Sequence, residues 1–132
     1  MHYTFHHHHH PKYTDVATNS KMSELDCACM MIKAKYLEEW ERRRKEIAKY
    51  WMENCKHKVL INDLYSHAVQ KFVIQLDDRD DFREKVCYPT RINYPYTLAP
   101  TENAVKLSKT VVSLPIYPEL TDAEVEIIND TL

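Results

Sequence analysis

The sequence predicts an α+β fold in which helix predominates over strand. Three observations support this prediction: an amphipathic segment over residues 23 to about 54, a run of β-favouring residues over 67–76, and helix-start signals at Thr101 and Thr121. With 132 residues, of which 44% are hydrophobic, the chain has the size of one average domain. It therefore has enough apolar side chains to form one core.

Residues 1–18 are predicted to form an irregular, histidine-rich segment. Five consecutive histidines, His6 to His10, stand before Pro11. Neighbouring imidazoles can bind a transition metal, but no carboxylate or cysteine pattern beside them fixes a coordination geometry. We expect no metal site here, and a metal-binding role of the histidine run is kept as the weakest of three functional hypotheses.

Residues 19–56 are predicted to be a long helical interface region. Ser23 followed by Asp26 fits a capping signature at the helix start. A continuous helix from there to about Asn54 would reach on the order of 48 Å, so it is expected either to kink or to extend towards another chain. The apolar residues that recur at helical spacing are Leu25, Cys29, Ile32, Tyr36, Trp40, Ile47 and Trp51.

Residues 57–132 are predicted to form a small α+β domain. The run HAVQKFVIQL over 67–76 predicts a strand, and the charged stretch that follows it predicts a short helix. Three prolines, at positions 89, 95 and 100, then favour an extended or looped path.

Two further helices are predicted near the carboxyl end. TENAVKLSKTVVSLP, residues 101–115, is interpreted as a helix that starts near Thr101. A last helix begins at Thr121, with Glu124 at the capping-box position. Helix thus outweighs strand in the predicted fold.

Charge and hydropathy exclude several classes of partner. The formal net charge of −2 argues against general binding to nucleic acid or to anionic membranes. The sequence has neither a membrane-spanning apolar stretch nor a signal-peptide core, so we expect a cytoplasmic protein. The basic run Arg42 to Arg44 is interpreted as a solvated helix face that pairs with Glu38 and Glu46.

Cysteine and glycine usage exclude further classes of site. The two cysteines at 27 and 29 point to different faces of a helix, which does not suit zinc, and all four cysteines are expected to be reduced thiols. The chain contains no glycine at all. Phosphate loops of the P-loop or dinucleotide-binding type need glycine and are therefore excluded.

Three segments resemble the DegT/StrS family of nucleotide-sugar aminotransferases. The strongest match is LPIYPELTDAEVEIINDTL (114–132), which is similar to the family's Leu-Pro-x-Tyr-Pro-x-Leu-Thr stretch and final helix. The second lies at 12–51, where ATNSKM resembles a Gly-x-Asn-Ser-Arg motif that opens a long helix, with Ala17 for the glycine and Lys21 for the arginine. The third is CYPTRIN (87–93), which looks like the family's His-Tyr-Pro-x-x-x-His segment.

The resemblance implies a fold-type I enzyme that uses pyridoxal 5′-phosphate (PLP) and moves an amino group onto a nucleotide-linked keto sugar. It implies that Asn19 reaches the PLP phosphate of a neighbouring subunit, and that Tyr88 and Arg91 lie near the nucleotide-sugar substrate. The family's Schiff-base lysine belongs to a large domain, and none of the twelve lysines here stands in such a context. No catalytic residue is therefore assigned.

Two functional hypotheses follow from the resemblance, besides the weaker metal-binding role of the histidine run. The chain is expected to be the carboxy-terminal, small-domain portion of a sugar aminotransferase, acting with a large-domain polypeptide or as a homodimer. The alternative is a non-catalytic dimerisation or interaction module derived from such an enzyme. Judged without the resemblance, Asn19 is an ordinary helix cap, Tyr88 a packed aromatic and Arg91 a solvated charge.

Overall fold

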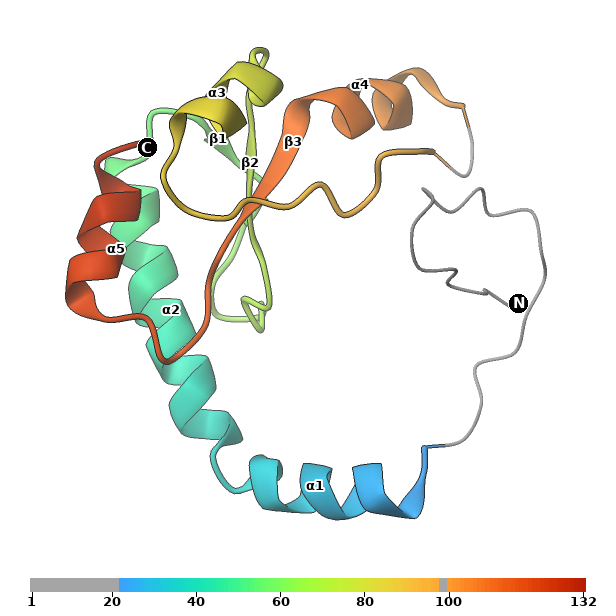
Figure 1. The fold of residues 1–132 in the computed structure, drawn as a ribbon, viewed down its shortest axis with the longest axis vertical. Helices are drawn as coiled ribbons and strands as arrows, with labels where there is room; N and C mark the ends of the chain where they lie inside the picture. Colours follow the sequence, from blue (N-terminus) through green and yellow to red (C-terminus); the bar gives the residue numbers. More distant parts are fainter. Residues whose placement is uncertain (1–21, 98–99) are drawn as a thin grey trace.

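A computed structural model describes residues 22–97 and 100–132 of the chain. The histidine-rich segment 1–18 and Asn19 lie outside the described residues. The α+β prediction is confirmed: the described part contains five helices and one antiparallel sheet (Figure 1). In chain order the elements are α1 (Glu24–Ala34), α2 (Leu37–Asn54), β1 (Lys58–Val59), β2 (Phe72–Gln75), α3 (Arg79–Lys85), α4 (Glu102–Thr110), β3 (Val111–Leu114) and α5 (Asp122–Asn129).

The three strands pair in the order β1-β2-β3, with β2 in the middle. Phe72 of β2 lies opposite Leu114 of β3, and Gln75 lies opposite Val111. The predicted helix over 101–115 is therefore wrong in its second half, because α4 ends at Thr110 and β3 follows directly. The β-branched pair at 111 and 112 suits a strand, and pairing with β2 decides the outcome.

The central strand begins later than residue 67. The backbone N–H of Val69 donates to Nδ1 of His67 at 2.9 Å, which holds a turn before β2. Val69 has a φ of 48°, a conformation that glycine usually takes. In a chain without glycine, the fully buried side chain of Val69 holds this strained backbone in place.

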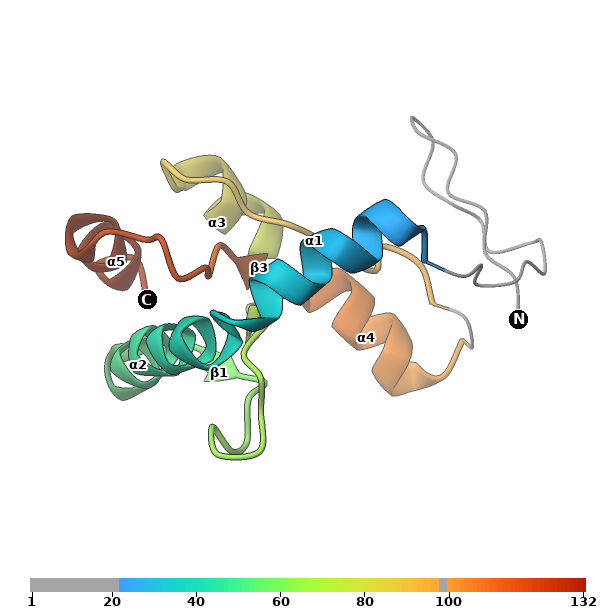
Figure 2. The same ribbon diagram turned by 90° about the horizontal axis from the view of Figure 1, so that it is seen from below.

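The predicted long helix is divided in two. The N–H groups of Lys35 and Tyr36 donate to carbonyls three residues earlier, at Ile32 and Lys33, which tightens the turn between the helices. Tyr36 then stacks on Trp40, with ring centroids 5.8 Å apart. Of the two predicted alternatives, the helix takes the kink, and α1 turns away from α2 and stands apart from the sheet (Figures 1 and 2).

One hydrophobic core joins α2, the sheet and α5. Trp51 of α2 is fully buried and meets Phe72 edge to face at 5.3 Å. Helix α5 lies beside α2 (Figure 1), and its Val125 and Ile128 are buried in the same core. The largest fully buried side chains are Trp51, Phe72, Ile47, Ile74, Val69 and Val112.

The predicted helix caps are confirmed. Ser23 accepts a hydrogen bond from the N–H of Asp26 at 3.1 Å. Thr121 and Glu124 form both halves of a capping box at the start of α5. Arg42 pairs with Glu46 at 2.5 Å as predicted. No helix in the described ranges is long and apolar enough to cross a membrane.

Candidate functional site

Tyr88 anchors the segment that follows α3. Its hydroxyl shares a hydrogen bond of 2.5 Å with Oγ1 of Thr131, and its ring packs against the core. Burial raises the pKa of the Tyr88 phenol, and the hydrogen bond to Thr131 opposes part of that rise. The side chain of Tyr88 thus ties the CYPTRIN segment to the end of α5.

Arg91 lies three residues further along, where the same segment crosses beside β3 (Figure 1). Its backbone N–H donates to the carbonyl of Ser113 at 3.0 Å, and the N–H of Ser113 donates to the carbonyl of Arg91 at 2.9 Å. These two hydrogen bonds fix the backbone of Arg91 but not its side chain. Within residues 22–97 and 100–132, the guanidinium of Arg91 has neither a hydrogen bond nor an ion pair.

Arg91 lines a cleft of about 440 Å³, which we call the Arg91 cleft. Among the described residues that line it, Lys71 and Arg91 are charged and none is a carboxylate. Nζ of Lys71 lies 5.7 Å from the ring centroid of the exposed Tyr94 and forms no ion pair with a described residue. The described residues that line it are Gln70, Lys71, Pro89, Thr90, Arg91, Asn93, Ser113, Leu114, Pro115, Ile116 and Tyr117.

The polar side chain of Asn93 in the cleft is held in place by a hydrogen bond to a buried residue. Nδ2 of Asn93 donates to Oγ of Ser113 at 2.6 Å, and Ser113 is itself buried. The sequence pointed to Arg91 through its resemblance segment but gave no signal for Lys71 or Ser113. Lys71 reaches the cleft because it precedes β2, and β2 pairs with the strand that the sequence presented as helix.

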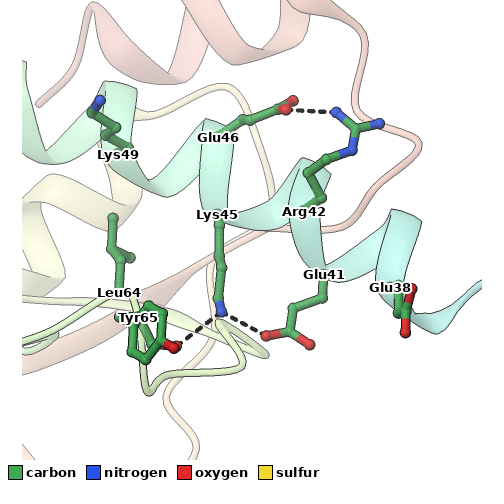
Figure 3. A pocket seen from close by; sticks show the side chains of 8 residues that line it. All are labelled: Glu38, Glu41, Arg42, Lys45, Glu46, Lys49, Leu64 and Tyr65. Carbon is green, nitrogen blue, oxygen red and sulfur yellow. Dashed lines mark hydrogen bonds and ion pairs between the residues drawn. The ribbon is translucent and has the colours of Figure 1, made fainter.

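A second hollow lies along α2 and has balanced charge (Figure 3). Nζ of Lys45 contacts Oε1 of Glu41 at 2.6 Å and donates to the carbonyl of Tyr65 at 3.1 Å. The hydrogen bond from Lys45 lowers the pKa of Glu41, and the charge of Lys45 adds to that effect. Arg42 is paired with Glu46 in the same hollow. Its cations are therefore neutralised by neighbours, unlike those of the Arg91 cleft.

The described residues supply neither a metal site nor a Schiff-base pocket. No group of three histidine, cysteine, aspartate or glutamate side chains in the described ranges could hold a metal ion. None of the lysines in those ranges is buried, whereas a lysine that binds PLP covalently needs an enclosed, preorganised pocket. The part of the chain that the structure describes does not by itself fit PLP.

Comparison with known families decides the relationship. Residues 2–132 match the DegT/DnrJ/EryC1/StrS aminotransferase family. The chain belongs to this family. The match covers nearly the whole chain, including the segments 12–51, 87–93 and 114–132 that carry the resemblance seen in the sequence.

Three proteins similar to this chain are longer than it. The chain is 31% identical over 137 residues to dTDP-3-amino-3,6-dideoxy-alpha-D-galactopyranose transaminase of Aneurinibacillus thermoaerophilus, an alignment that covers 89% of this chain and 38% of that protein. The fold of this chain is similar to that of S. venezuelae DesV, which was solved in complex with a ketimine intermediate. The TM-score is 0.75 and the sequence identity 21%, over 91% of this chain and 38% of DesV.

A second solved structure has the same relationship to the chain. The aminotransferase TlmJ of Streptoalloteichus hindustanus is similar with a TM-score of 0.74 at 16% identity, again over 91% of this chain and 38% of that one. The chain described here thus spans little more than a third of the length of each of these three proteins.

Proposed function

We propose that this chain is the small-domain portion of a PLP-dependent sugar aminotransferase and works together with a large-domain polypeptide. The large-domain polypeptide supplies the Schiff-base lysine, and this chain supplies groups that complete the cofactor and substrate sites. The proposal rests on membership of the aminotransferase family and on the similarity to about 38% of a sugar transaminase.

The Arg91 cleft is the observation that carries the substrate part of the proposal. Lys71 and Arg91 have no carboxylate partner in the part of the chain that the structure describes, and such cations favour phosphate oxygens. The exposed ring of Tyr117 lines the same cleft and offers a flat surface to a sugar or base. These groups together suit a nucleotide-linked sugar, with the phosphates at Lys71 and Arg91.

Two further residues belong to the proposal. Asn19 contributes an amide donor to the PLP phosphate of a neighbouring subunit, a role that suits an amide next to a helix start. Tyr88, next to the cleft residue Pro89, contacts the substrate through its ring edge while Thr131 holds its hydroxyl. When bound, PLP supplies the electron sink for amino transfer.

Complementation tests this function. The chain is mixed with a truncated form of the Aneurinibacillus transaminase that lacks the matching portion, and amino transfer to the keto sugar is measured. We expect activity from the mixture and none from either polypeptide alone. Arg91→Met should raise KM for the nucleotide sugar, and Asn19→Ala should reduce the PLP retained by the complex. A complex that forms but stays inactive with every large-domain partner would overturn the proposal.

A non-catalytic interaction module is the second candidate. The observation that favours it is α1, which carries exposed apolar side chains and no buried residue. A module predicts that the chain binds a full-length family enzyme without changing its absorption spectrum or its rate. The aminotransferase proposal predicts instead that the PLP absorbance and the activity of the large-domain polypeptide both depend on the added chain.

A further inference from the structure

The turn before β2 depends on an unprotonated ring nitrogen. The backbone N–H of Val69 donates to Nδ1 of His67 at 2.9 Å. A ring nitrogen accepts a hydrogen bond only while it carries no proton, and both nitrogens of a charged histidine are donors. Histidine is the side chain whose charge ordinarily changes between pH 5 and 8. Because His67 is exposed, its ring exchanges protons directly with water, and the bond to Val69 depends on the pH of the solvent.

The same hydrogen bond supports a strained backbone. Val69 has a φ of 48° and is the only described residue with a positive φ. A β-branched residue is an outlier in this conformation, which persists only where the surrounding contacts impose it. Two contacts do so here: the side chain of Val69 is fully buried in the core, and its N–H is bonded to His67. Loss of the bond to His67 leaves burial alone to hold the turn.

The turn leads directly into the Arg91 cleft. Lys71 follows Val69 by two residues and lines the cleft. Nζ of Lys71 lies 5.7 Å from the ring centroid of Tyr94. The next residue, Phe72, is fully buried and paired with β3, so the chain is fixed again from that point. A change at Val69 therefore acts on the short segment that places Lys71 in the cleft.

Neighbouring charges do not take the place of this hydrogen bond. Lys45 of α2 contacts Glu41 and donates to the carbonyl of Tyr65 (Figure 3), while Asp63 accepts hydrogen bonds from Tyr65 and Ser66. In the described part of the chain no carboxylate forms an ion pair with a histidine. The charged residues on the elements that pack against residues 63–71 are Glu38, Glu41, Arg42, Lys45, Glu46 and Lys49 of α2, Asp63 and Lys71 of the connection itself, and Arg91 beside β3.

We propose that His67 is a pH-sensitive switch for the Arg91 cleft. Neutral His67 holds the turn at Val69 and keeps Lys71 in the cleft, whereas protonated His67 releases the turn and Lys71 loses its position there. The positive charge of Lys71 is therefore in place at neutral and mildly alkaline pH and is withdrawn from the cleft as the pH falls through the range in which histidine titrates. The inference rests on the turn and the cleft and does not depend on the proposed function.

Asparagine at position 67 separates the acceptor from its titration. An asparagine side chain accepts a hydrogen bond from the N–H two residues later in an Asx turn, and it does not change charge with pH. In the unaltered chain, the protection of the Val69 amide against hydrogen exchange, corrected for the intrinsic effect of pH, should fall about fivefold from pH 8 to pH 5. His67→Asn should keep its protection at both pH values, and His67→Phe should lack it at both.

Nuclear magnetic resonance of the same proteins follows Lys71. In the unaltered chain, the ring protons of Tyr94 should shift with the same midpoint pH as the amide of Val69. Lys71→Met should abolish the pH response of the Tyr94 ring and leave that of Val69 intact. His57→Asn is the matched control, because the ring of His57 contacts Phe82 and not the turn. It should leave both responses unchanged.

Three results would overturn the inference. The first is equal protection of the Val69 amide at pH 8 and pH 5 in the unaltered chain. The second is a pH response of Val69 that persists in His67→Asn, which would assign the titration to another group. The third is a pH response of Val69 without one of the Tyr94 ring, which would mean that Lys71 stays in the cleft when the turn is released.

Discussion

The indole Nε1 of Trp51 donates a hydrogen bond of 3.0 Å to the backbone carbonyl of Val125, across 74 residues of sequence. This bond joins α2 to α5 inside the core, where the Trp51 side chain has no solvent exposure. A buried indole N–H needs a hydrogen-bond acceptor. The position of α5 on α2 is therefore fixed by this hydrogen bond as well as by apolar packing.

We expect Trp51→Phe to lower the free energy of unfolding by about 2 kcal/mol, because it removes this hydrogen bond and leaves a small void. Urea unfolding followed by circular dichroism measures the change. Trp40→Phe is the matched control, since Trp40 is partly exposed, stacks on Tyr36 and lies outside the buried core. An equal loss in both variants would contradict the role assigned to the bond.

The capping box of α5 predicts an acid-sensitive contribution to stability. Hydrogen bonds from Thr121, the backbone N–H first and then the hydroxyl, lower the pKa of Glu124 below its ordinary 4.5. Because the folded-state pKa is depressed, this contribution is present above pH 4.5 and is lost as the pH falls through the lower, folded-state value.

Unfolding by urea at neutral and at acid pH measures this loss. Glu124→Gln should lose less stability on acidification than the unaltered protein, while Glu119→Gln, at an exposed carboxylate outside the cap, should behave like the unaltered protein. Thr121→Ala should cost about 1 kcal/mol at neutral pH, the usual worth of such a cap.

Local rules predicted the parts of the fold that depend on neighbours in sequence. The starts of α1 and α5 follow from Ser23 and Thr121, whose hydroxyls bond within three residues. Strand β3 was missed although Val111 and Val112 favour a strand, because it follows α4 directly and its pairing with β2 separates the two elements. The two-residue strand β1 was also missed, since its pairing with β2 decides its conformation.

The candidate site was predictable only in part for the same reason. Arg91 came from a resemblance within one short segment, but Lys71 joins it through the β2–β3 pairing. Thr131, the partner of Tyr88, lies 43 residues away in sequence. Contacts of this kind are set by tertiary packing and leave no periodic signal in the sequence.

The ion pair between Arg43 and Asp122 is predicted to add little stability. Nη2 of Arg43 lies 2.6 Å from Oδ1 of Asp122, but the Asp122 side chain is 91% exposed. Asp122→Asn should change the free energy of unfolding by no more than about 0.5 kcal/mol. Arg43→Ala should cost more, roughly 1 to 2 kcal/mol, because the carbonyl of the buried Leu120 also loses its donor at 3.1 Å.

The bond between Tyr88 and Thr131 is predicted to stabilise the segment that carries Arg91. Tyr88→Phe should lower the free energy of unfolding by about 1 kcal/mol, because a partly buried hydrogen bond is lost. Tyr65→Phe is the control, since Tyr65 is 92% exposed. A double-mutant cycle with Thr131→Ala isolates the pair, and a coupling energy near zero would contradict the assignment.

The Arg91 cleft is predicted to bind a nucleoside diphosphate through charge. Arg91→Met and Lys71→Met should each weaken binding about tenfold, because each removes a charge-assisted hydrogen bond to phosphate. Added NaCl should weaken binding to the unaltered chain and have less effect on the double variant, since salt screens exposed charges. Lys49→Met is the control, because Lys49 lines the charge-balanced hollow along α2. Isothermal titration calorimetry measures the affinities of all five proteins, and a loss in Lys49→Met equal to that in Arg91→Met would place the phosphate outside the cleft.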